Sequence, residues 1–295
     1  MTRRLLALIT LVTLPSCTEQ SALPESRFQP TDALVTQITA NIETSASLAL
    51  VADIDHARLG AEVASVMGPA RALIFSDPAL ESRVIALNAL AALELPLRVL
   101  AYENPETGDA RVIYNRYEYL ASRYQFTGPE ARALADDYAA SFEGALDGIG
   151  QAHLADFDDN TMQPDGIITI ESPYDFEQTL ARVSAAIDAQ DDTLHFGKVD
   201  FQANAAALGI TLPPSHMILF GAPGPGGKAM ASAPTLGLDG FCQKFLIWQA
   251  EDGKVRLSFN DLIALARRQG ADIALPLRVI DFRLKSVFEE ALSPD

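Results

Sequence analysis

Apolar and polar positions along the chain recur in the same order at an offset of 145 residues. Apolar runs typical of β-strands end at Phe75 and at Phe220, and each is followed by a proline and then by small residues. Phe75 and Phe220 are 145 positions apart, as are Pro78 and Pro223. Because the offset recurs, we expect an internal duplication with two copies of one domain.

Each copy is predicted to open with an amphipathic helix. Apolar residues recur at helical spacing in both copies, at Leu34, Val35, Ile38 and Ile42 and then at Leu180, Val183 and Ile187. In the second copy Ser172 is the expected N-cap, with Pro173 in the first turn and Asp175 three residues after the serine. One amphipathic helix is therefore used twice.

A short strand and a small-residue helix are expected next in each copy. The strands end at Asp55 and Asp200, and the helices cover 61–67 and 203–208. The segment 221–228, rich in glycine and proline, is interpreted as a loop.

Each copy is then predicted to form a hairpin and a closing helix. Apolar runs over 96–103 and 244–249 pass through turns at Gly108 and Gly253 into second strands, which end at Asn115 and Asn260. We interpret these two asparagines as turn caps. Helical patterns follow over 129–146 and 279–292.

The expected organisation has five parts: a signal peptide over 1–16, a tether over 17–27, a first domain over 28–148, an acidic linker over 149–166 and a second domain over 167–295. The signal peptide combines Arg3 and Arg4 with an apolar run from Leu5 to Leu14 that is shorter than the roughly 20 residues of a membrane span. The tetrapeptide LPSC, ending at Cys17, resembles the lipobox of bacterial lipoproteins. The resemblance implies lipidation of Cys17 and a chain anchored in the cell envelope, on the periplasmic face of a membrane; ordinary secretion is the alternative.

Composition narrows the range of partners. Hydrophobic residues make up 48% of the chain and charged residues 21%, which is typical of a folded globular protein. The formal net charge of −17 disfavours nucleic acid, whose phosphates are bound by Lys and Arg. Once Cys17 is lipidated, Cys242 is the remaining cysteine, so no intramolecular disulfide is expected.

Both copies resemble the domain-of-unknown-function family 302. The second copy carries ILFGAPGPGGKAMASAPTLGLD over 218–239 and FLIWQAEDGKVRLSFND over 245–261, and the first carries IDHA over 54–57 and VIYN over 112–115. The resemblance implies an α+β fold like that of the TATA-binding protein, which associates as a dimer. Two tandem two-layer domains would then pack as an intramolecular pseudo-dimer.

The two copies depart from the family pattern in complementary places. His56 of the first copy is replaced by Phe201 in the second, whereas the first copy lacks counterparts of Gly221 and Met230. We therefore expect a non-catalytic binding role, with a small ligand or an envelope protein held between the halves. The candidate ligand-binding residues are His56, Gly221, Lys228 and Met230.

Two other functions remain open at this stage. One is an envelope enzyme in which Asp55 orients His56 as a base or ligand, and the other is a purely structural envelope protein. No metal or cofactor is expected, although Met67, Met230, Cys242 and His56 are residue types that suit a soft metal or haem.

Two local motifs fail on spacing. The phosphate-loop pattern lacks a glycine six residues before Lys228, and Ala229 follows that lysine where a hydroxyl is needed. Asp156, Asp158 and Asn160 have calcium-loop spacing, but Thr161 stands where glycine is required, so we interpret the segment as a solvated linker.

Overall fold

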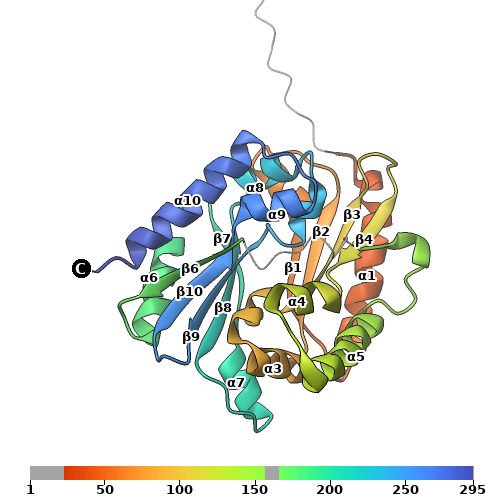
Figure 1. Cartoon of the computed structure of the whole chain (residues 1–295). Helices are drawn as coiled ribbons and strands as arrows, with labels where there is room; N and C mark the ends of the chain where they lie inside the picture. The colour runs from red at the N-terminus through yellow and green to blue at the C-terminus, as the bar shows by residue number, and fades with distance from the viewer. Residues whose placement is uncertain (1–22, 157–165, 295) are drawn as a thin grey trace, which may run out of the picture.

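The computed structural model describes residues 23–156 and 166–294. The predicted lipidation site Cys17, most of the predicted tether, and the calcium-loop residues Asp158 and Asn160 lie outside these ranges. Within them the chain forms two similar α+β halves side by side (Figure 1).

Over residues 23–156, the first half forms five strands and five α-helices. Its elements are η1 (Glu25–Arg27), α1 (Gln29–Thr44), β1 (Ala49–Asp55), α2 (His56–Glu62), β2 (Ala70–Ser76), α3 (Pro78–Leu87), η2 (Ala89–Glu94), β3 (Leu97–Glu103), β4 (Ala110–Tyr114), α4 (Tyr117–Tyr124), α5 (Gly128–Ala145), η3 (Gln151–His153) and β5 (Leu154–Asp156).

The second half repeats this order after an initial strand of its own. Its elements are β6 (Ile167–Ser172), α6 (Phe176–Asp188), β7 (Leu194–Asp200), α7 (Phe201–Ala207), β8 (Ser215–Gly221), α8 (Pro223–Met230), η5 (Pro234–Gly237), β9 (Gln243–Gln249), β10 (Val255–Asn260), α9 (Leu262–Arg268) and α10 (Leu275–Ala291). The bounds of β1 and β7, α2 and α7, and β2 and β8 differ by 145 residues at both ends.

Each half has a five-stranded sheet with the same strand order. The first sheet runs β1-β2-β3-β4-β5, and the second runs β7-β8-β9-β10-β6. Even the irregularity between Leu50 and Ala52 on β1 recurs between His195 and Gly197 on β7. The duplication predicted from the sequence and the α+β class are therefore confirmed.

The fifth strands of the two sheets have different origins. β6 comes from the start of the second half and pairs antiparallel with β10, whereas β5 comes from the predicted linker and pairs parallel with β4. β5 was not predicted, because this polar segment lacks the apolar alternation of a strand.

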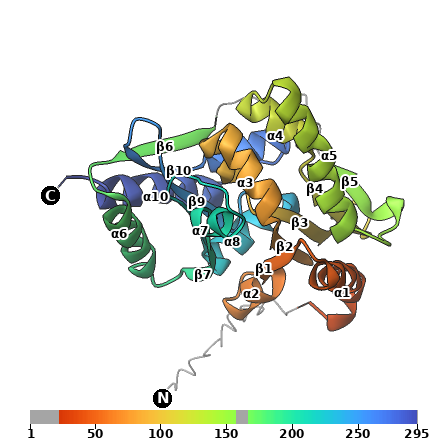
Figure 2. The ribbon, with the colours of Figure 1, turned by 90° about the horizontal axis from the view of Figure 1, so that it is seen from below.

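The two halves meet through a reciprocal set of helices. α2 of the first half packs against α8 of the second, and the equivalent helices α7 and α3 also pack against each other (Figure 2). When a helix of one half packs against a helix of the other, and their two equivalents also pack together, the interface has two-fold symmetry. The chain is thus an intramolecular pseudo-dimer, as predicted.

Three local predictions were wrong. α6 is capped by Asp175, whose side chain accepts a hydrogen bond from Gln178 N, while Ser172 ends β6. The small-residue helix of the first copy begins at His56 rather than at residue 61, because Asp55 caps it there. The glycine- and proline-rich segment predicted as a loop forms α8, with Pro223 in its first turn, where the missing proline N–H has no helical partner to lose.

Candidate functional site

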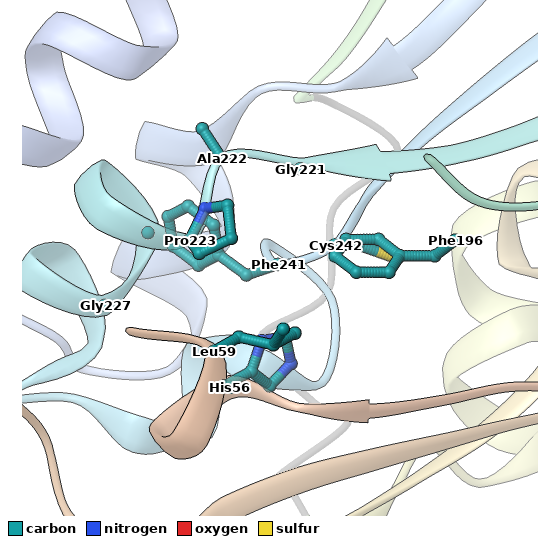
Figure 3. A pocket seen from close by; sticks show the side chains of 10 residues that line it. His56, Leu59, Phe196, Gly221, Ala222, Pro223, Gly227, Phe241 and Cys242 are labelled. Atoms are coloured by element: carbon teal, nitrogen blue, oxygen red, sulfur yellow. The ribbon is translucent and has the colours of Figure 1, made fainter. Parts of the chain in front are cut away.

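A pocket of about 20 Å³ lies between α2 of the first half and α8 of the second (Figure 3). The first half contributes His56 and Leu59. The second half contributes the rest of the lining: Phe196, Gly221, Ala222, Pro223, Gly226, Gly227, Phe241 and Cys242. About 10–15 Å³ accommodates one water-sized particle, so this pocket is far smaller than a site for a drug-sized ligand.

Glycines on α8 lie against the segment that directly follows α2, and the approach is closest at Gly227. A Cβ atom on Gly227 would lie 2.7 Å from Ser65 Oγ, and one on Gly224 would lie 3.5 Å from Val63 Cγ2. The glycine-rich segment therefore serves close packing between the halves, which explains why its spacing does not fit a phosphate loop.

His56 begins α2 and is half-buried, with its Nε2 atom fully buried and without a hydrogen-bond partner among the described residues. Burial and the charge of Arg98 lower the pKa of His56 to about 4, against a hydrogen bond with the Gly237 backbone that acts in the opposite direction. The imidazole is therefore neutral at physiological pH.

Asp55 does not orient this imidazole. Its Oδ1 accepts a hydrogen bond from Arg58 N over 2.9 Å, and its Oδ2 accepts one from Arg58 Nη1 over 2.6 Å. The carboxylate thus caps α2 and binds Arg58, while the imidazole of His56 forms its hydrogen bond with the backbone of Gly237. The geometry of an Asp55–His56 catalytic dyad is not formed.

The other predicted site residues occupy different surroundings. Gly221 lines the pocket, whereas Lys228 lies on the exposed face of α8 and outside the lining. Met230 is fully buried beside His56, since a Cβ on Gly237 would lie 2.7 Å from Met230 Cε and 3.2 Å from His56 Cδ2.

The equivalent position between α7 and α3 carries larger buried side chains. Phe201 replaces His56 and is buried, and Glu81 replaces Gly226 and is 1% exposed. Glu81 Oε2 accepts a hydrogen bond from Ser76 Oγ over 2.7 Å. Burial raises the pKa of Glu81 to about 8. The two pseudo-equivalent positions therefore differ: a small pocket lies at the one with His56 and Gly226, and the bulkier buried Phe201 and Glu81 occupy the other.

A buried polar network crosses the interface beside the pocket. Arg123 donates a hydrogen bond to Glu94 over 2.6 Å, and Arg268 donates one to Asp239 over 2.8 Å. Asn115 of the first half donates to Asp239 over 2.9 Å and accepts from Arg268, both in the second half. The interpretation of Asn115 as a turn cap was wrong, because its side chain joins the two halves.

Two more buried cations lie in this network. Lys244 Nζ is 3.5 Å from Glu94 Oε2, and Arg98 Nη1 donates to the Leu238 carbonyl over 2.8 Å. Burial would raise the pKa of Glu94, but Lys244, Arg123 and Arg268 outweigh that effect and lower it to about 2.

Burial lowers the pKa of Lys244 to about 8 and raises that of the Cys242 thiol. Lys244 is consequently mostly charged at neutral pH, and Cys242 is a buried neutral thiol rather than a nucleophile.

This network was missed at the sequence level, although one signal was present. Glu94 and Asp239 are 145 positions apart, as are Arg123 and Arg268. Charged residues that recur at the 145-residue offset within apolar segments could have indicated buried ion pairs.

Comparison with known proteins places the fold and the repeats in a family. The model of the family described as "Domain of unknown function DUF302" matches residues 25–149 and again residues 168–289. The chain therefore belongs to this family and contains two tandem copies of its domain. A solved structure, that of an uncharacterized conserved DUF302 protein from Bacillus stearothermophilus, shares 14% identity; the match covers 43% of this chain and 98% of that one, with a TM-score of 0.38.

Curated relatives carry the name of a fluoride-specific ion channel. FluC 1 of Brucella suis biovar 1 (strain 1330) is 35% identical over 118 residues, covering 39% of this chain and 46% of the relative. FluC 1 of Brucella abortus biovar 1 (strain 9-941) is 35% identical over the same length, covering 43% of that relative. The matched part thus spans less than half the length of these proteins. Among the described residues of this chain, no helix combines the length and apolarity needed to cross a membrane.

Proposed function

We propose that this chain is a lipid-anchored protein of the bacterial cell envelope that binds, without catalysis, a ligand about the size of water between its two repeats. The lipobox-like LPSC sequence supports the anchor. The ligand would lie in the pocket between α2 and α8.

One observation carries the binding role. The two interface positions related by the pseudo-two-fold differ, because the one with His56 and Gly226 forms a pocket while the one with Phe201 and Glu81 carries bulkier buried side chains. An interface with only a structural role would be expected to fill both positions, since unfilled volume removes packing contacts. The buried Nε2 of His56 gives the pocket one polar group to orient a ligand.

Native mass spectrometry of the mature protein, purified gently from its own envelope, tests this function. The wild type should carry a small mass excess that disappears on denaturation. His56→Phe, which copies the residue of the equivalent position, should lack it. His195→Phe is the matched control, because His195 lies on β7 and pairs with Asp188 away from the pocket.

A mass excess retained by His56→Phe, or none in the wild type, would contradict binding in this pocket. The second result would favour the purely structural role.

We infer a second candidate function, fluoride handling, from the curated relatives. In them a segment similar to this chain is part of a protein named as a fluoride-specific ion channel, and segments joined in one chain commonly act together. The chain would then act beside such a channel. A strain lacking this protein should be more sensitive to fluoride than its parent, and the wild-type chain should restore growth; equal sensitivity would contradict this candidate.

A further inference from the structure

A second cavity, of about 10 Å³, lies inside the second half next to the repeat interface. It shares no lining residue with the His56 pocket. Its polar lining comes from Asp239, Gln243, Lys244 and Asn260, and most of the remainder is aromatic or aliphatic. Because about 10–15 Å³ holds one water-sized particle, the cavity admits a single water or a monoatomic ion.

Two of the lining residues are buried and have unsatisfied hydrogen-bonding groups. The Lys244 side chain is 1% exposed, and its ion pair with Glu94 at 3.5 Å forms no hydrogen bond, so Nζ has no hydrogen-bond partner among the described residues. Asn260 is 7% exposed, and neither Oδ1 nor Nδ2 has a partner within that part of the chain. Such groups are costly to bury, and each requires an explanation.

Comparison of the two repeats shows why the side chain of Asn260 has no hydrogen-bond partner among the described residues. Asn115, the counterpart of Asn260, bonds to the Asp239–Arg268 pair of the other half. The matching pair for Asn260 would be Glu94 and Arg123. Glu94 Oε1 already accepts hydrogen bonds from Arg123 and Tyr124, and Lys244 lies on the side of Oε2.

Charge around the cavity is unbalanced. Arg123 pairs with Glu94 and Arg268 pairs with Asp239, each over less than 3 Å. Lys244 and Asp239 line the cavity itself, and the charge of the buried Arg98 acts on Lys244. Among the described residues, the polar network therefore contains four cations and two carboxylates. The buried Asp281, which accepts a hydrogen bond from Leu262 N beside the cavity, is paired with Lys285. Asp239 also lines the cavity, but its two oxygens already accept hydrogen bonds from Asn115 and Arg268.

We propose that the cavity lined by Lys244 and Asn260 binds one small monovalent anion, of which fluoride has the right size. The Lys244 ammonium and Asn260 Nδ2 would donate hydrogen bonds to it. A water molecule would satisfy Asn260 but would leave the excess positive charge uncompensated, whereas an anion does both. Fluoride is about as large as water, and chloride and bromide exceed the volume of the cavity.

The proposal goes beyond the ligand of the His56 pocket and is tested separately. The thermal unfolding midpoint of the full chain is measured at pH 7 in fluoride, chloride and bromide at one ionic strength. Fluoride should raise the midpoint in a saturable manner and more than the larger halides, because an ion bound only by the folded state stabilises it. Lys244→Met should weaken the apparent fluoride affinity roughly tenfold or more.

Lys228→Met is the matched control, since Lys228 is exposed on α8, and it should retain the fluoride effect. His56→Phe should retain it too, which separates this cavity from the pocket of the proposed function. If Lys244→Met does not fold, Asn260→Ala decides, because it removes a donor without removing charge. An equal, non-saturating effect of all three halides, or a fluoride effect that survives both Lys244→Met and Asn260→Ala, would overturn the proposal.

Discussion

Glu94 and Asp239 are the same position of the repeat, and each accepts a hydrogen bond from the arginine 29 residues further along the chain. These bonds, from Arg123 and Arg268, measure 2.6 and 2.8 Å. The two pairs are buried at the interface of the halves, where removing one partner of an ion pair leaves a costly uncompensated charge. The network therefore fixes how the halves fit together.

The two equivalent asparagines should differ in their contributions to stability. Asn115→Ala removes hydrogen bonds to Asp239 and Arg268 across the interface and should lower the free energy of unfolding by about 1–3 kcal/mol. Asn260→Ala removes a side chain without partners among the described residues, so in halide-free buffer it should cost clearly less. Urea unfolding of both variants provides the comparison. Equal losses would show that Asn115 does not join the halves as described.

Stability should depend on the protonation of His56 below neutral pH. Its pKa of about 4 in the folded chain is lower than the ordinary value of 6.5, so the unfolded chain binds more protons between these values. The neutral imidazole therefore contributes to the free energy of unfolding above pH 6.5, and this contribution is lost as the pH falls towards 4. The shift corresponds to at most about 3 kcal/mol.

Urea midpoints of the wild type and His56→Phe, measured from pH 7 to pH 4, would reveal this difference. The wild type should lose stability relative to the variant as the pH falls. Glu81 acts in the opposite direction, because its pKa is raised to about 8, but it is present in both proteins and cancels from the comparison. A constant difference between the two proteins would mean that His56 is protonated normally in the folded chain.

Gly227 should be a sensitive position on α8. Gly227→Ala places a Cβ 2.7 Å from Ser65 Oγ and 3.4 Å from the Ser65 backbone oxygen, and overpacking of this kind costs about 1–3 kcal/mol. Gly144→Ala on α5 is the matched control, because its Cβ would meet nothing within 4 Å. The control should be neutral or stabilising by up to about 1 kcal/mol, owing to the helix propensity of alanine. Thermal unfolding of the two variants measures both effects, and a harmless Gly227→Ala would show that Ser65, in the segment after α2, does not pack closely against α8.

Most of the architecture could be predicted from the sequence, because the same series of elements occurs twice along the chain. β1 and β7 end at Asp55 and Asp200 as predicted, since an apolar run followed by a capping aspartate is a local signal. α8 was missed because its glycines and prolines favour a loop locally, whereas packing against α2 holds them in a helix. Local helix propensity does not reflect a packing contact with α2, which lies more than 160 residues earlier in the chain.

The candidate site was less accessible to prediction. His56 and Gly221 were selected from family-like motifs, and the structure places both on the same pocket. The contribution of Arg98 to the pKa of His56, and the bonds of Asn115 to Asp239, join residues 42 and 124 positions apart. Such contacts carry no local pattern, so they become visible only when both halves are folded together.

The difference between His56 and Phe201 has an evolutionary consequence. In a dimer of identical chains, any substitution appears on both sides of the two-fold axis, so one position cannot be opened while its mate is closed. Covalent joining of the repeats removes that constraint, because each half is encoded separately. The tandem arrangement thus permits an asymmetric pocket on a scaffold that largely retains its internal symmetry.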